Sequence, residues 1–137
     1  MEKILVGIDP QKTNIWAGIH ALNLAKRTGA KVSFLLIIDP KSRELGQDSE
    51  TEIRAAMEEK IEPLIEGARS EGIAVDYYLA YGSYETELVK FVQENKITLL
   101  VVEAPSGKEK SAERFSEFLE KIRHRLNCRI EIVHQKI

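Results

Sequence analysis

Short apolar runs alternate with longer amphipathic stretches along the chain, and this alternation restricts the possible folds more than any other feature of the sequence. We predict five strands, at residues 4–8, 32–38, 75–79, 97–102 and 130–133. We predict four helices, at residues 14–28, 49–70, 83–95 and 111–127. Because strand–helix–strand units with short connections form right-handed crossovers, the pattern indicates a parallel sheet with helices on both faces.

The five runs differ in how apolar they are, and this difference predicts the order of the strands. Runs 4–8, 32–38 and 97–102 are almost entirely apolar, as expected for strands that are buried on both faces. The other two runs contain Asp76 and Glu131, so we place them at the edges of the sheet. The sequence therefore predicts an α/β fold with a doubly wound, open five-stranded parallel sheet in the order 3-2-1-4-5. We expect one domain over the 137 residues.

The expected helix ends carry residues that satisfy free backbone groups. Ser49, Ser83 and Ser111 are each placed to cap the start of a helix, and Asn95 is placed to end the third helix. No serine lies in a nucleophile motif at a strand–helix turn, so these serines are interpreted as caps. In the first helix, the apolar spacing predicts a buried face made of Ile15, Gly18, Ile19, Leu22 and Ala25.

Charge and composition exclude several classes of protein. The net charge is −2, so no overall attraction draws the chain to nucleic acid or to an anionic membrane. The longest apolar runs, such as residues 34–38, are far too short to cross a bilayer. A predicted strand begins at residue 4, which leaves no room for a secretory signal, and the single Cys128 cannot form an internal disulfide. We therefore expect a cytoplasmic protein that binds neither nucleic acid nor membrane.

The predicted strand order reverses between the first and the fourth strand. Ligands of open α/β sheets bind at such a point, beside the carboxyl ends of the strands, so the loops to consider are residues 9–13 and 103–110. Asp9 ends the first strand, and its carboxylate could accept a hydrogen bond from a ribose hydroxyl or an adenine amino group. The same carboxylate could instead accept only from backbone amides of the following turn.

Three segments have a recognisable order and spacing. The first is Ile-Leu-Val-Gly-Ile-Asp at residues 4–9, and the second is Gly-Ala-Lys-Val followed by Leu-Leu-Ile-Ile-Asp within residues 29–39. The third is Tyr-Gly-Ser at residues 81–83, followed by a helix and the apolar run at 97–102. Together they resemble the universal stress protein family over about residues 3–134. The resemblance implies an adenine nucleotide alpha hydrolase-like fold and a stress-response or regulatory role.

Members of this family that bind ATP carry a characteristic loop after the fourth strand. Its pattern is glycine, two residues, glycine, nine residues, then glycine and a serine or threonine. The first glycine position falls here on Ala104, and the second is retained as Gly107. Without a gap, the later glycine and hydroxyl positions fall on Glu117 and Phe118. Ala104 adds a methyl group where the backbone must approach a phosphate, and Pro105 removes an amide donor.

Charge also opposes a polyphosphate in this loop. Glu103 and Glu109 would repel the phosphates, since both carry negative charge. The repulsion costs about 1–4 kcal/mol for a pair of charges about 4 Å apart, and Lys108 and Lys110 could offset part of that cost. We therefore predict a degraded triphosphate-binding loop, while the adenosine end of the cleft can persist, with ATP or AMP as candidate ligands. The candidate nucleotide contacts are Gly7, Ile8, Asp9, Ile37, Ala104, Ser106, Gly107 and Lys108.

The last predicted strand would be an exposed edge, which proteins tend to cover or pair. In the resembled family this strand pairs with its twin across a two-fold axis. Ile130, Ile132 and Val133 would supply the apolar contacts of such a homodimer. The alternative is a monomer whose edge is protected by Arg129 and Glu131.

Three functions remain open. The first is a non-enzymatic, dimeric stress or regulatory protein that does not depend on ATP. The second is a module that binds an adenine nucleotide in the cleft, and the third is an enzyme of a related nucleotide-handling family. No catalytic constellation supports the third, and no metal site is expected because His20, His124 and His134 lie on separate elements.

Overall fold

The computed structural model describes residues 2–10, 12, 15–41, 49–105 and 109–134, except for the side chain of residue 109. The described residues form five strands and four helices. The strands are β1 (Lys3–Ile8), β2 (Lys31–Ile38), β3 (Val75–Tyr81), β4 (Leu99–Ala104) and β5 (Arg129–His134). The helices are α1 (Ile15–Thr28), α2 (Glu50–Ser70), α3 (Tyr84–Glu94) and α4 (Glu109–Arg123).

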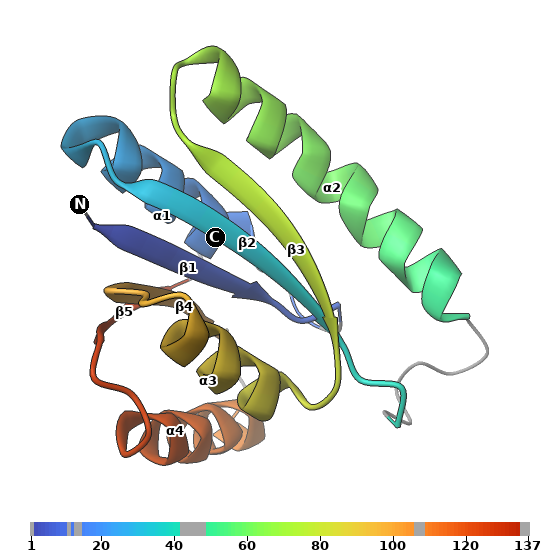
Figure 1. Ribbon diagram of the computed structural model, residues 1–137. Coiled ribbons are helices and arrows are strands. Elements are labelled where there is room, and N and C mark those ends of the chain that lie inside the picture. The colour runs from blue at the N-terminus through green and yellow to red at the C-terminus, as the bar shows by residue number, and fades with distance from the viewer. Residues whose placement is uncertain (1, 11, 13–14, 42–48, 106–108, 135–137) are drawn as a thin grey trace.

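The strands form one parallel sheet in the order β3-β2-β1-β4-β5 (Figure 1). This order confirms the predicted doubly wound α/β fold, with β3 and β5 at the edges. Asp76 and Glu131, the polar residues that predicted these edges, lie in β3 and β5. The three central strands are buried almost throughout, because helices cover both faces of the sheet.

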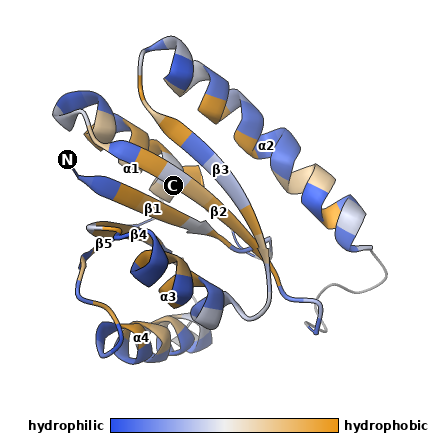
Figure 2. Cartoon of the chain, viewed as in Figure 1, coloured by the Kyte–Doolittle hydropathy of each residue, from blue (hydrophilic) through white to orange (hydrophobic). Residues whose placement is uncertain are grey.

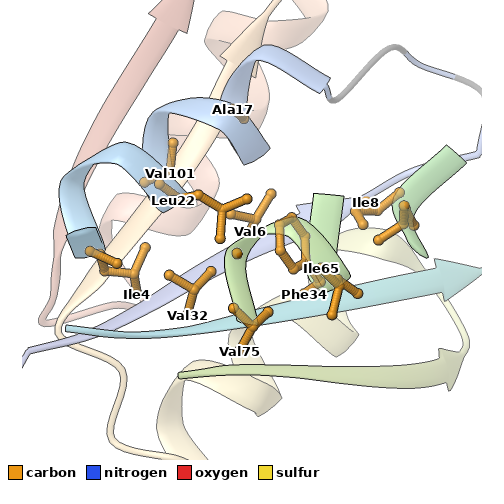
Figure 3. Close-up of a cluster of buried hydrophobic side chains, with 14 of the residues drawn as sticks. Ile4, Val6, Ile8, Ala17, Leu22, Val32, Phe34, Ile65, Val75 and Val101 are labelled. Carbon is orange, nitrogen blue, oxygen red and sulfur yellow. The ribbon is translucent and has the colours of Figure 1, made fainter. Parts of the chain in front are cut away.

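The sheet separates two hydrophobic clusters that are made of alternate residues of each strand. Along β1, Ile4 and Val6 belong to the cluster under α1 and α2, whereas Leu5 belongs to the cluster over α3 and α4. Figure 3 shows part of the first cluster, which includes Phe34 of β2 and Ile65 of α2. Figure 2 shows hydrophobic residues along the central strands and a mixture of residues along the helices, as expected for helices that bury one side only.

Two of the three predicted helix caps are confirmed. The Ser49 hydroxyl oxygen accepts a hydrogen bond from the Glu52 amide at 3.1 Å, and that of Ser83 accepts from the Thr86 amide at 3.3 Å. Asn95 ends α3 as predicted. The prediction for Ser111 is wrong, because α4 begins at residue 109 and Ser111 lies inside the helix. Glutamate and lysine at residues 109 and 110 have high helix propensity, so the helix extends through them.

The buried face of α1 also differs in part from the prediction. Gly18, Leu22 and Ala25 are buried as predicted, but Ile15 is 43% exposed and Ile19 is half-buried. Ala17 and Ala21 are buried beside Gly18 instead. The helix lies so close to the sheet that a Cβ atom on Gly18 would come within 3.1 Å of the Phe34 ring. Small residues therefore mark the face that contacts the sheet, and the large Ile15 falls outside it.

The fourth strand begins and ends two residues later than predicted. Ile97 is buried, but it belongs to the turn after α3, where its amide donates to the carbonyl of Val92. The shift has a consequence for the cleft. Glu103 and Ala104 are the last residues of β4, held within the sheet, and the loop that follows starts at Pro105.

Candidate functional site

The two strands at the switch point separate before they end. Residue pairing between β1 and β4 runs from Ile4–Leu99 to Val6–Val101, although β1 continues to Ile8. On its other side β1 stays paired with β2 as far as Ile8. The backbones of β1 and β4 are therefore no longer paired at their carboxyl ends, and we call this place, where the sheet topology predicts a ligand site, the crevice.

One wall of this crevice is formed by a contact between β4 and α1. An Oε1 atom of Glu103 accepts a hydrogen bond from the backbone amide of Ala17, with an N–O distance of 3.0 Å. Ala17 lies in the first turn of α1, where amides have no partner within the helix. A carboxylate there is stabilised by the positive end of the helix dipole, typically by about 0.3–1 kcal/mol. The Glu103 carboxylate thus occupies the place at the start of α1 where an anion from solution would otherwise bind.

The opposite wall is formed by α3 against β1. The Tyr84 hydroxyl donates to the carbonyl oxygen of Gly7 at 3.1 Å. A Cβ atom on Gly7 would lie 2.7 Å from that hydroxyl and 2.6 Å from Cδ1 of Leu88. Burial, with a smaller contribution from the charge of Asp9, raises the pKa of Tyr84, so the hydroxyl stays protonated and remains a donor. Gly7 is therefore a packing residue on the α3 side of β1, where Tyr84 and Leu88 occupy the space beside its Cα.

Aromatic rings extend this wall towards α4. The Tyr84 and Phe118 ring centroids lie 5.6 Å apart, and those of Phe115 and Phe118 lie 6.3 Å apart. The three side chains pack against the cluster that contains Ile37. In the ungapped alignment given above, the serine or threonine position of the ATP-binding pattern falls on Phe118, so a large apolar ring would stand there in place of a hydroxyl donor.

The other predicted nucleotide contacts lie as follows. Ile8 and Ile37 are buried in β1 and β2, and Ala104 is buried at the end of β4. Asp9 is half-buried directly after β1, and its carbonyl oxygen accepts from the Lys12 amide at 3.0 Å. Ser106, Gly107 and Lys108 lie outside the described residues. Ile8, Asp9 and Ala104 thus share one end of the sheet, and their contacts with a ligand remain a prediction.

The predicted dimer residues lie on both faces of β5. Ile130 packs with the cluster on the α3 and α4 side, and Val133 packs with the cluster on the α1 side. Ile132 is 36% exposed. Glu131 is one of the two charged residues expected to protect this edge in a monomer. Its Oε2 atom lies 3.3 Å from the Nε2 atom of His20 in α1. An isologous contact would therefore bury mainly Ile132 and the outer backbone of the strand.

The described part of the chain gives little support for a reactive thiol, a metal site or a membrane-spanning helix. Burial raises the pKa of the Cys128 thiol, which leaves it less thiolate than an exposed cysteine at neutral pH. Among the described residues, no three histidine, cysteine, aspartate or glutamate side chains are grouped so that they could hold a metal ion. No helix in the same residues is both long and apolar enough to span a bilayer.

Sequence reasoning missed two groups at the crevice. The first is the Ala17 amide, which meets a carboxylate 86 positions away along the chain. The second is Tyr84, whose hydroxyl partner is 77 positions away. The only local signal for Tyr84 is its place directly after the Ser83 cap, where it begins a helix next to the cleft.

Comparison with known proteins gives one family and several solved structures. The model of the universal stress protein family matches residues 1–134. A universal stress protein solved in complex with cAMP has a TM-score of 0.71 at 19% identity, over 97% of this chain and 96% of that one. A universal stress protein family protein from Arabidopsis thaliana with AMP bound has a TM-score of 0.69 at 15% identity, over 99% of this chain and 93% of that one.

A third solved structure is the universal stress protein from Archaeoglobus fulgidus in complex with dAMP. Its TM-score is 0.64 at 17% identity, over 97% of this chain and 98% of that one. No curated protein matches the chain. At these identities the three structures establish the shared fold.

Proposed function

Because the chain belongs to the universal stress protein family, we propose that it is a non-enzymatic stress-response or regulatory protein whose action does not depend on ATP. The single observation that carries this proposal is the Glu103 carboxylate held against the Ala17 amide at 3.0 Å. We further propose that the chain acts as one cytoplasmic domain and forms a homodimer.

The energetic argument concerns the triphosphate. A phosphate group near the crevice would meet the Glu103 charge, and a like-charge pair about 4 Å apart costs about 1–4 kcal/mol, depending on the remaining water. That range corresponds to about a tenfold to thousandfold loss of affinity. The Ala17 amide is already occupied, so binding a phosphate there would also require breaking a charge-assisted hydrogen bond.

A second candidate function is binding of an adenine mononucleotide. The observation that favours it is the opening between β1 and β4 after the Val6–Val101 pair, next to Asp9. AMP or a cyclic nucleotide carries less negative charge than ATP, so it would meet less repulsion from Glu103. Structural neighbours bound to AMP, dAMP and cAMP give this choice of ligands its rationale.

The homodimer is supported by the position of β5. Among the described residues, this strand pairs only with β4, and Ile132 is exposed on it. Pairing of two β5 strands across a two-fold axis would satisfy the outer backbone groups of each and bury both Ile132 side chains.

Thermal unfolding in the presence of Mg–ATP, AMP and cAMP tests the proposal. We expect no shift with Mg–ATP for the wild-type chain, and a shift in Glu103→Gln, which keeps the shape of the side chain but removes its charge. Glu113→Gln is the matched control, since it changes the net charge equally on the exposed surface of α4. A ligand at a hundredfold over its Kd stabilises by about 2.7 kcal/mol, so wild-type stabilisation of that size by Mg–ATP would contradict the proposal.

A further inference from the structure

The free edge of β3 is a second place where the chain could bind a ligand. In the parallel ladder between β2 and β3, the Val32 amide donates to the Ala74 carbonyl, and the register pairs Val32 with Val75. Even-numbered residues of β3 therefore direct their amides and carbonyls towards β2. Val75, Tyr77, Leu79 and Tyr81 direct theirs outward, away from the sheet.

Only the first of these outward positions is covered. The Arg69 side chain of α2 donates to the Val75 carbonyl oxygen through Nε at 3.2 Å and Nη2 at 2.8 Å. Within the described residues, no hydrogen bond reaches the outward backbone groups of Tyr77 and Leu79. Among the described residues, the strand thus has one protected outward position, and at least the next two, Tyr77 and Leu79, have an amide and a carbonyl that can pair with another strand.

A groove lies beside the beginning of this open stretch, at Asp76, Tyr77 and Tyr78. Helix α2 runs beside β3 at the outer side of the sheet (Figure 1), and the space between them has a volume of about 500 Å³. Its lining consists of Glu62, Ile65, Glu66, Arg69, Asp76, Tyr77 and Tyr78. The Tyr77 hydroxyl is screened from water, and among the described residues no acceptor meets it with hydrogen-bond geometry, although the Glu58 carboxylate lies nearby. Burial, and secondarily the nearby Glu58 carboxylate, raises the pKa of Tyr77, so this hydroxyl stays a donor.

The charge of the groove is negative on balance, because the carboxylates of Glu62 and Glu66 outnumber the one guanidinium, that of Arg69, which is bound to the Val75 carbonyl. Asp76 is neutralised by Lys31, with an Oδ2–Nζ distance of 2.7 Å. Glu62 and Glu66 are exposed on successive turns of α2, and no ion pair involves either of them within the described residues. Residues four apart share one side of a helix, so the two carboxylates form a continuous acidic wall.

We propose that an extended, cationic peptide segment of another protein binds in this groove and pairs with β3 as an additional strand. Its backbone would bond to Tyr77 and Leu79, and alternate side chains would point to opposite sides of the sheet. Basic side chains on the α2 side meet Glu62 and Glu66. Apolar side chains on the other side meet Tyr78, which is 40% exposed and whose ring lies tilted against that of Phe91 with a centroid distance of 5.1 Å.

A second copy of this chain is a poorer occupant of the same edge. Pairing of two β3 strands would bring the Glu62 and Glu66 walls of both copies towards one another. Like charges facing each other across an interface disfavour the contact, whereas a basic peptide gains from the same wall. The acidic wall therefore selects against self-association and in favour of a cationic partner.

The test uses a blocked hexapeptide of alternating lysine and valine, titrated into the full chain by fluorescence anisotropy. We expect binding to the wild type, at least tenfold weaker binding to Glu62→Lys/Glu66→Lys, and unchanged binding to Glu113→Lys/Glu120→Lys, which alters the net charge equally on α4. A glutamate–valine hexapeptide should show the reverse preference and bind the Glu62→Lys/Glu66→Lys chain. Hydrogen exchange should show new protection of the Tyr77 and Leu79 amides when the lysine–valine peptide binds.

Three outcomes would overturn the proposal. The first is no binding of the lysine–valine peptide at millimolar concentration. The second is binding that Glu62→Lys/Glu66→Lys leaves unchanged, or that leaves exchange at Tyr77 and Leu79 unaffected. The third is protection of these two amides that rises with protein concentration in the absence of peptide, since that would make a second copy the occupant.

Discussion

Gly7→Ala tests whether glycine at the end of β1 is required by packing. The new Cβ atom would lie 2.6 Å from Cδ1 of Leu88 and 2.7 Å from the hydroxyl of Tyr84, both well inside contact distance. Leu88 is fully buried, and Tyr84 donates to the Gly7 carbonyl. Neither side chain can move away without losing contacts of its own.

The size of the effect follows from these contacts. Inserting a methyl group into a tightly packed site costs about 1–3 kcal/mol. If Tyr84 rotates to relieve the overlap, its hydrogen bond is lost as well, which adds about 0.5–1.5 kcal/mol. We therefore expect Gly7→Ala to lower the free energy of unfolding by about 2–4 kcal/mol, without any ligand present. A domain of ordinary stability, at about 5–15 kcal/mol, stays folded after such a loss.

Urea denaturation of a double-mutant cycle measures the coupling. Tyr84→Phe removes the hydroxyl that the new methyl group would meet, so Gly7→Ala/Tyr84→Phe should be less destabilised than the sum of the single variants by at least about 0.5 kcal/mol. Gly67→Ala is the control, because no atom lies within 4 Å of its added Cβ and alanine favours the helix. A loss below about 0.5 kcal/mol for Gly7→Ala, or strict additivity with Tyr84→Phe, would refute the packing explanation.

Three further predictions concern other parts of the chain. The hydrogen bond and charge of Lys31 lower the pKa of Asp76 below its ordinary value of 3.8, so the stability from this pair is present above that pH and is lost as the pH falls through the lowered pKa. Asp76→Asn should therefore flatten the acid limb of a stability–pH curve, and an unchanged limb would exclude the pair as a contributor. Cys128, whose pKa is raised by burial, should react with a thiol reagent at pH 8 more slowly than in the urea-unfolded chain; equal rates would show an accessible thiolate. Ile132→Asp should halve the mass measured by light scattering, and an unchanged dimer mass would refute pairing through β5.

The strand order could be predicted because it depends on local composition. Central strands need apolar residues on both faces, and the two runs that carry Asp76 and Glu131 do not meet this need. The start of β4 could not be predicted in the same way. Ile97 is as apolar and as buried as a strand residue, but its burial comes from the turn after α3. Apolar character reports burial and does not distinguish a strand from the turn that leads into it.

The contacts at the crevice lay beyond the reach of sequence reasoning for a different reason. The glycine pattern drew attention to the segment that contains Glu103 and Ala104, but it indicates nothing about which amide a carboxylate will meet. The Glu103–Ala17 and Tyr84–Gly7 hydrogen bonds each join residues that are far apart in the chain and adjacent only after the sheet has formed. Besides the place of Tyr84 directly after the Ser83 cap, small residues were an available signal, since Gly7 and Gly18 both lie where a neighbouring element approaches closely.

The crevice and the β3 edge pose the same physical problem, which is a set of backbone groups that the fold leaves without partners. At the crevice, Glu103 supplies an internal acceptor to the start of α1, and this internal acceptor competes with any external anion. At the edge, Arg69 supplies an internal donor to Val75 and to no residue beyond it. A backbone group that already has a hydrogen-bond partner within the chain gains little from a ligand. Ligand binding is therefore less favourable where such internal hydrogen bonds exist and more favourable where they are missing. By this reasoning, the stretch of β3 after Val75 is a stronger candidate for a regulatory contact than the phosphate end of the cleft.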